Sequence, residues 1–84
     1  MVYYLIVCRS LTHAQRTASA LERAGIMAHI LRSPKNIDRE GCSHSVKVAE
    51  RSLADALTVL ARAELTPKRV YIMSGDGGYK EVLL

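Results

Sequence analysis

Two cysteines are the side chains of this sequence best suited to covalent chemistry. Cys42 lies between Gly41 and Ser43 in a polar stretch, so its thiol is expected to be exposed on a loop that can present it to another protein. The thiolate is the nucleophilic form of cysteine, and nearby cations or a helix N-terminus lower the thiol pKa. This setting favours a functional thiol at Cys42; the alternative is an incidental loop cysteine.

Cys8 has different surroundings, because it ends a nearly unbroken apolar run that begins at Val2. Free cysteines in such runs usually pack as small hydrophobic residues. A packed residue is therefore the favoured interpretation of Cys8, and a resolving thiol that partners Cys42 is the alternative. The spacing of the two cysteines excludes a CxxC site, and two cysteines in a chain of this type indicate reduced thiols rather than a disulfide framework.

The composition indicates one small globular domain with an aliphatic core. The chain has 84 residues, no Trp and no Phe, so Leu, Ile, Val, Ala and a few Tyr must fill the core. Its twelve Lys and Arg residues are interleaved with eight acids, which favours an anionic partner only weakly. No apolar run approaches the ~20 residues of a membrane span, and the N-terminal stretch lacks the features of a signal peptide, so we expect a cytoplasmic protein.

The hydrophobic pattern predicts two helices and four strands. The expected strands cover residues 2–8, 27–32, 45–49 and 70–73. The first expected helix covers residues 12–24; Thr12 and Gln15 cap its start, and Gly25 stops it. The second expected helix runs from Ser52 to at least Ala61, and Ser52 and Asp55 cap its start. Residues 35–43 are expected to be a loop, residues 74–78 a flexible turn and residues 79–84 an apolar end.

This order is typical of an α+β, ferredoxin-like βαββαβ sandwich, in which a four-stranded antiparallel sheet carries both helices on one face. Right-handed crossovers give the sheet order 4-1-3-2, so the first and third strands are neighbours and antiparallel. We expect the domain to cover residues 1–73, with a Gly-rich turn and C-terminal extension over 74–84. The alternation in 45–49 predicts that Val46 and Val48 face the core and that Ser45 and Lys47 face a wetter side.

This topology brings the two cysteines to one end of the domain. The end of the first strand, the start of the first helix, the loop before the third strand and the start of the fourth strand all meet there. The candidate residues at this rim are Cys8 and Cys42 as thiols, Arg9, His13, Lys35, Arg39 and His44 as binding residues, and Lys68 and Arg69 as further cations. Together these cations would favour a thiolate, although each alone is most often a solvated charge. A core-capping role is the alternative for His44.

The sequence contains the stretches YYLIVCRSLTHAQRTASALERAGI and SPKNIDREGCSHSVKV, followed by a helix of leucines and alanines and by VY in the last strand. This pattern resembles the small selenium/sulfur-carrier-like proteins, formerly a domain of unknown function. Thr12-His13, Pro34-Lys35 and Cys42 match that family's motif places, over about residues 3 to 73; the family's cysteine is commonly followed by glycine, whereas here Ser43 follows. The resemblance implies that Cys42 carries sulfur or selenium, as a persulfide or selenopersulfide, between protein donors and acceptors. It implies no cofactor and no metal.

Other functions have less support in the sequence. A regulatory or interaction module could dimerise through the open sheet face or through the tail, and the residues expected on that face are Tyr3 or Tyr4, His29, Lys47 and Tyr71. RNA binding is disfavoured because residues 45–49 offer no aromatic side chain for base stacking. Metal transfer would need a second cysteine beside Cys8. The pattern thus favours a carrier or accessory protein over a turnover enzyme, with no membrane or nucleic-acid partner.

Overall fold

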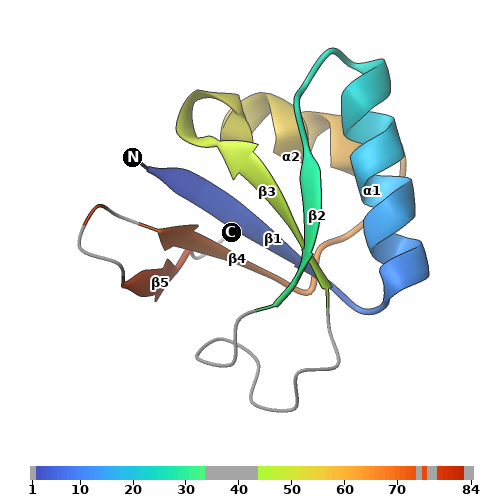
Figure 1. Cartoon of the computed structure of the whole chain (residues 1–84). Helices are drawn as coiled ribbons and strands as arrows, with labels where there is room; N and C mark the ends of the chain where they lie inside the picture. Colours follow the sequence, from blue (N-terminus) through green and yellow to red (C-terminus); the bar gives the residue numbers. More distant parts are fainter. Residues whose placement is uncertain (1, 34–43, 74, 76–77, 83–84) are drawn as a thin grey trace.

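The computed structural model of the chain describes residues 2–33, 44–73, 75 and 78–82. Within these residues, two helices cover one face of a five-stranded antiparallel sheet (Figure 1). The elements are β1 (Tyr3–Cys8), α1 (Leu11–Arg23), β2 (His29–Arg32), β3 (His44–Ala49), the short 3-10 helix η1 (Glu50–Ser52), α2 (Leu53–Arg62), β4 (Arg69–Met73) and β5 (Tyr79–Glu81). The α+β class is as predicted.

The sheet order is β2-β3-β1-β4-β5. The expectation of a four-stranded sheet was wrong, because the segment predicted as a C-terminal extension contributes β5. The backbone folds back after β4, so that Tyr79 pairs with Met73 and Glu81 with Tyr71. The predicted neighbours β1 and β3 are adjacent and antiparallel, and Cys8 is the Cα partner of His44.

The N-terminus of α1 differs from the expected Thr12 cap. Ser10 is the N-cap, and its hydroxyl accepts a hydrogen bond from the backbone N–H of His13 at 3.2 Å. Serine is among the best N-cap residues because its oxygen satisfies a free N–H of the first turn. The predicted stop at Gly25 is confirmed: Gly25 has φ of 81°, and Ile26 N–H donates to the carbonyl of Leu21 at 2.9 Å, as in a Schellman motif.

The start of α2 also differs from the prediction. Ser52 makes no side-chain capping bond, and η1 leads directly into the helix instead. At the other end, Glu64 adopts a left-handed conformation with φ of 58°, and the next residue, Leu65, donates its N–H to Leu60 at 2.9 Å. The chain therefore closes α2 with the same kind of turn as α1, but with Glu64 where glycine is usual.

Four strand boundaries shift by one or two residues, and the first is that of β1, which begins one residue late at Tyr3. β2 begins at His29, two residues later than predicted, because its pairing with β3 starts at His29 opposite Lys47. β3 begins one residue early at His44, which pairs with both Arg32 and Cys8. β4 begins one residue early at Arg69, opposite Val7. In each case pairing with a neighbouring strand sets the boundary, and the local sequence does not contain that strand.

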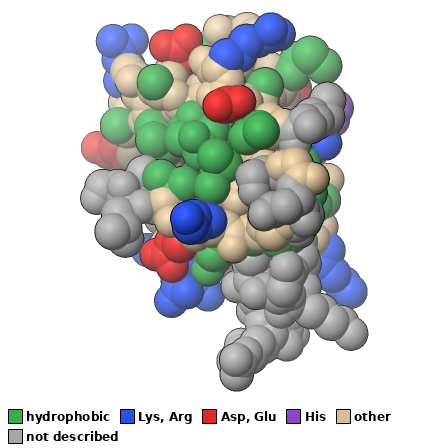
Figure 2. Space-filling model, turned by 90° about the vertical axis from the view of Figure 1, so that its left-hand side faces the viewer, with side chains coloured by type: hydrophobic (Ala, Val, Ile, Leu, Met, Phe, Trp, Pro, Cys, Tyr) green, Lys and Arg blue, Asp and Glu red, His purple; other side chains and the backbone are tan. Residues whose placement is uncertain are grey.

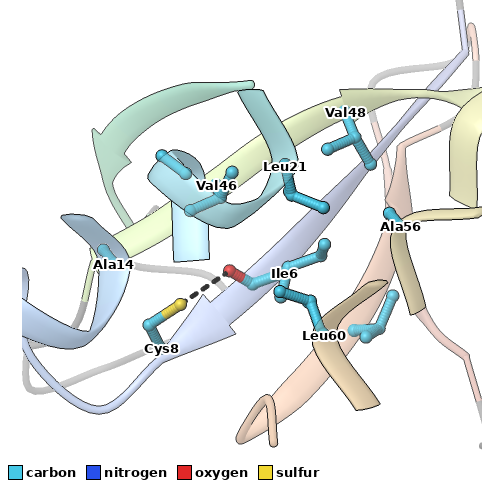
Figure 3. Close-up of a cluster of buried hydrophobic side chains, with 10 residues drawn as sticks. Ile6, Cys8, Ala14, Leu21, Val46, Val48, Ala56 and Leu60 are labelled. Atoms are coloured by element: carbon cyan, nitrogen blue, oxygen red, sulfur yellow. Dashed lines mark hydrogen bonds between the residues drawn. The ribbon is translucent and has the colours of Figure 1, made fainter. Parts of the chain in front are cut away.

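The core lies between the sheet and the helices (Figure 3). Alternate residues of the central strands point toward the helices and meet the inner faces of α1 and α2. The buried cluster consists of Ile6, Cys8, Ala14, Ala18, Leu21, Val46, Val48, Ala56, Leu60 and Val70. These small aliphatic side chains allow the helices to pack closely on the sheet, as the composition predicted.

The opposite face of the sheet is also buried at its centre. Leu5 is fully buried and Val7 is 3% exposed. Ser45 was predicted to face a wetter side, and that prediction is wrong: it is fully buried, and its hydroxyl lies 2.6 Å from that of Ser33. A buried hydroxyl needs such a partner, because leaving it unpaired would cost about 1–3 kcal/mol.

Candidate functional site

Cys8 lies at the end of β1 on the helix-facing side of the sheet. Its side chain is fully buried. The thiol donates to the carbonyl oxygen of Ile6 at 3.6 Å (Figure 3) and to the hydroxyl of Thr17 at 3.7 Å. Cys8 therefore occupies the packed position that the apolar run favoured, with both of its partners inside the protein.

Burial raises the pKa of the Cys8 thiol, and the Thr17 hydroxyl, which can donate to a thiolate, opposes this shift only partly. A thiol with a raised pKa holds its proton and is a poor nucleophile near neutral pH. In this conformation the chemistry of Cys8 is that of a core residue.

Two histidines lie near this end of the sheet. His44 is the Cα partner of Cys8, and His13 lies in the first turn of α1, one helical turn before Thr17. Both side chains are half-buried, and the Nδ1 atom of each is buried without a hydrogen-bond partner among the described residues. Each of these nitrogens has an unused hydrogen-bonding position among the described residues.

The described cations of the rim are not equivalent. Arg9 and Lys68 are exposed, and the backbone N–H of Lys68 donates to the carbonyl of Val7 at 2.8 Å, which ties the start of β4 to the end of β1. Arg69 faces the other side of the sheet. Its guanidinium lies 3.5 Å from the hydroxyl of Tyr71 and 4.0 Å from a carboxylate oxygen of Glu81. Arg69 therefore contacts side chains of β4 and β5 on the sheet face opposite to Cys8.

Cys42, Lys35 and Arg39 lie outside the described residues. The described chain reaches Ser33 on one side of them and resumes at His44 on the other. These two points are close, because Arg32 pairs with His44 and the Ser33 and Ser45 hydroxyls share a hydrogen bond. The described residues on both sides of the segment that contains the predicted thiol therefore lie at the same end of the sheet as Cys8.

The helix-free face of the sheet carries a separate group of polar and aromatic side chains. The strand register puts Tyr3, His29, Lys47 and Tyr71 on this face, as predicted, and Tyr4 on the helix side. The ammonium of Lys47 lies 4.3 Å from the centre of the Tyr3 ring, a cation–π contact. A small pocket of about 250 Å³ adjoins this pair. The contact pairs Lys47 with Tyr3 on this face.

One polar contact near the rim was not predicted from the sequence. Thr17 is fully buried and supplies the hydroxyl next to the Cys8 thiol. The sequence did indicate that Thr17 is buried, because its helical spacing puts it on the same face of the helix as the buried residues Ala14 and Leu21. A polar residue within an apolar helical stripe indicates a buried partner.

The described residues contain no group of three or more His, Cys, Asp or Glu side chains that could hold a metal ion. Among the same residues, neither helix is long and apolar enough to cross a membrane. The accessible polar side chains described near the rim are imidazole and basic groups, which suit the binding of an anion.

The comparisons with known proteins identify a family. The model of the family described as "Putative Se/S carrier protein-like" matches residues 3–72. The chain belongs to this family. The match to the Se/S carrier family begins at β1 and ends within β4, and it spans the segment that contains Cys42. Comparison with curated proteins and with solved structures gave no significant match.

Proposed function

We propose that this protein accepts sulfur or selenium on Cys42 and passes it, as a persulfide or selenopersulfide, from one protein to another. The observation that carries the proposal is the Se/S carrier family match over residues 3–72, which includes Cys42. The burial of Cys8 supports the choice of residue, since Cys42 is the other cysteine of the chain. A thiol relay of this kind needs a reducing compartment, and we propose the cytoplasm.

The proposed transfer is a thiol exchange. The Cys42 thiolate attacks the terminal sulfur of a donor protein's persulfide, a new S–S bond forms to Cys42, and the donor's S–S bond breaks with its cysteine leaving as a thiolate. An acceptor thiolate then removes the terminal sulfur from Cys42 in the same way. The sulfane sulfur keeps its oxidation state throughout, so the relay consumes no oxidant, metal or nucleotide. Selenium would travel by the same steps.

Binding residues at the rim would stabilise the anionic chalcogen. Cys42 stands two positions before His44 in the sequence, and His44 pairs with the end of β1. Arg9 and Lys68 supply exposed positive charge at that end, and cations near a thiol favour its thiolate. We propose that His13 and His44 act with Arg9, and that Lys35 and Arg39 complete the set.

A resolving role for Cys8 stays a prediction. In that role the Cys8 thiolate would attack the sulfur of Cys42, form a Cys8–Cys42 disulfide and release the terminal sulfur as hydrosulfide. The raised pKa and full burial of Cys8 oppose this step while the core is closed. The relay we propose therefore uses Cys42 alone, and resolution by Cys8 would require the end of β1 to open.

Site-resolved alkylation tests the assignment of the reactive thiol. The folded chain is treated with iodoacetamide at neutral pH, and the modification of each cysteine is followed by peptide mass spectrometry. We expect Cys42 to react faster than a free peptide thiol and Cys8 to react only after unfolding in denaturant. The Cys8→Ala variant should keep the fast phase, and the Cys42→Ser variant should lose it. If Cys42 reacts no faster than the peptide thiol, the carrier proposal fails.

A non-catalytic interaction module is the second candidate, and one observation favours it. Figure 2 shows hydrophobic side chains gathered on the face seen from the side of β5, with charged side chains around them. Such a patch is a common feature of protein interfaces. In this alternative the protein dimerises or binds a partner there, and Cys42→Ser leaves the association unchanged. Light scattering on the wild type and on Cys42→Ser distinguishes the two functions.

A further inference from the structure

A shallow groove begins at the first turn of α1 and extends along this helix in the direction away from the rim. It has a volume of about 570 Å³. Its lining comes from α1 and from the segment that follows α2, and consists of Thr12, Gln15, Arg16, Ser19, Ala20, Arg23, Ala63 and Leu65. Figure 1 shows how the end of α2 passes beside α1, and the two helices are in contact.

The positive charges of this groove have no ion-pair partner among the described residues. Arg16 and Arg23 are its charged residues, both are exposed, and neither forms an ion pair with a described carboxylate; the ion pair within the described part of the chain joins Arg69 and Glu81. The helical first turn of α1 contains no acidic residue either. A groove with this charge attracts a negatively charged partner.

The spacing of the groove fits a helix. Arg16 and Arg23 are seven residues apart on one side of α1, which corresponds to about 10.5 Å along the helix axis. Two carboxylates seven residues apart on a partner helix have the same spacing. Between the arginines, the small side chains of Ser19, Ala20 and Ala63 allow a second helix to approach closely, and Leu65 offers it an apolar contact.

We propose that this groove docks an acidic amphipathic helix of a partner protein. Carboxylates of that helix pair with Arg16 and Arg23, and its apolar side chains rest on Ala20 and Leu65. The groove begins at Thr12, in the first turn of α1 and near the end of β1, so a docked helix points its end toward the rim. The identity of the partner as a sulfur or selenium donor or acceptor rests on the proposed carrier function; the docking itself does not.

Binding to a defined probe tests the docking. The probe is a fluorescein-labelled helical peptide with glutamates at positions i and i+7 and with leucine and alanine between them. The protein is the full chain with Cys42→Ser, so the result does not depend on thiol chemistry. We expect saturable, salt-sensitive binding, and movement of the amide NMR signals of the groove residues. Arg16→Glu and Arg23→Glu should each weaken binding by about tenfold, with circular dichroism confirming that the variants fold.

Arg51→Glu is the matched control, since Arg51 is an exposed arginine outside the groove. This substitution should change the affinity by less than about twofold, because it alters only the net charge of the protein and the screened electrostatic potential that a distant charge produces at the groove. An equal loss with Arg51→Glu, NMR shifts outside the groove, or no binding would overturn the proposal. So would inorganic phosphate at millimolar concentration producing the same shifts, since the groove would then be a small-anion site. Failure of the alkylation test would remove the carrier function and leave this docking result intact.

Discussion

The thiol of Cys8 donates a hydrogen bond to the hydroxyl of Thr17 across 3.7 Å of the protein core. This contact joins the end of β1 to the middle of α1, and both side chains are fully buried. It makes Cys8 part of the packing that holds the helix on the sheet. This burial supports our proposal that Cys42 is the carrier thiol.

The pH dependence of stability should report the buried state of Cys8. The folded protein holds the Cys8 proton more tightly than the unfolded chain, because burial raises the thiol pKa. This group therefore contributes stability that is complete below about pH 8.5, the pKa of cysteine in an unfolded chain, and is lost as the pH rises toward the folded pKa. Urea unfolding at pH 7 and pH 9.5 should show a larger fall in unfolding free energy for the wild type than for Cys8→Ala. Equal falls would contradict a buried, protonated Cys8.

The hydrogen bond between Ser33 and Ser45 should stabilise the edge of the sheet from which the Cys42 segment departs. Their hydroxyl oxygens are 2.6 Å apart, and the residues are 3% and 0% exposed. A double-mutant cycle with Ser33→Ala, Ser45→Ala and the double variant should give a coupling of about 1 kcal/mol in the unfolding free energy. Additive effects of the two substitutions would show that the bond does not contribute.

The two helix ends should respond in opposite directions to changes at their left-handed residues. Gly25→Ala should lower the unfolding free energy by about 1 kcal/mol, and the cost is one of backbone strain, since no atom lies within 4 Å of an added Cβ. Glu64→Gly should raise it by about 0.5 kcal/mol, because it relieves a positive φ. Thermal melts of the two variants check both signs. Stabilisation by Gly25→Ala would mean that α1 does not end in the turn described here.

Removal of residues 74–84 should expose the edge of β4. The strand β5 pairs with β4, and an uncovered edge strand offers its backbone groups to another chain. The truncated protein should melt at a lower temperature and associate, as measured by light scattering at several concentrations. Glu81→Gln in the full chain is the control: its bridge to Arg69 is long and exposed, so this variant should stay as stable as the wild type. An unchanged, monomeric truncation product would refute a structural role for β5.

The sequence predicted most of the fold because the strong signals are local. The unbroken apolar run of β1 and the helical spacing of Ala14, Ala18 and Leu21 are both visible in the local sequence, and Gly25 marks the end of its helix. The missed features depend on partners distant in the chain. Tyr79 becomes strand because Met73 is available to pair with it, and Ser45 is buried because Ser33 meets it there.

The site was predictable to a smaller extent. Strand order predicted that Cys8 and His44 lie at the same end of the sheet, and the structure pairs them, since the adjacency of β1 and β3 follows from topology alone. The direction of Arg69 toward Tyr71 and Glu81 depended on β5 and could not be foreseen without it. The charged groove of Arg16 and Arg23 was also missed, because it arises from the passage of the chain after α2 beside α1.

The most direct test of the central claim is the intact mass of the protein after exposure to a persulfide donor. A low-molecular-weight persulfide is added to the folded chain at neutral pH, excess reagent is removed, and the mass is recorded before and after reduction. The account predicts a gain of one sulfur atom in the wild type and in Cys8→Ala, reversed by dithiothreitol, and no gain in Cys42→Ser. A wild type that gains no sulfur, or a Cys42→Ser variant that gains as much as the wild type, would contradict it.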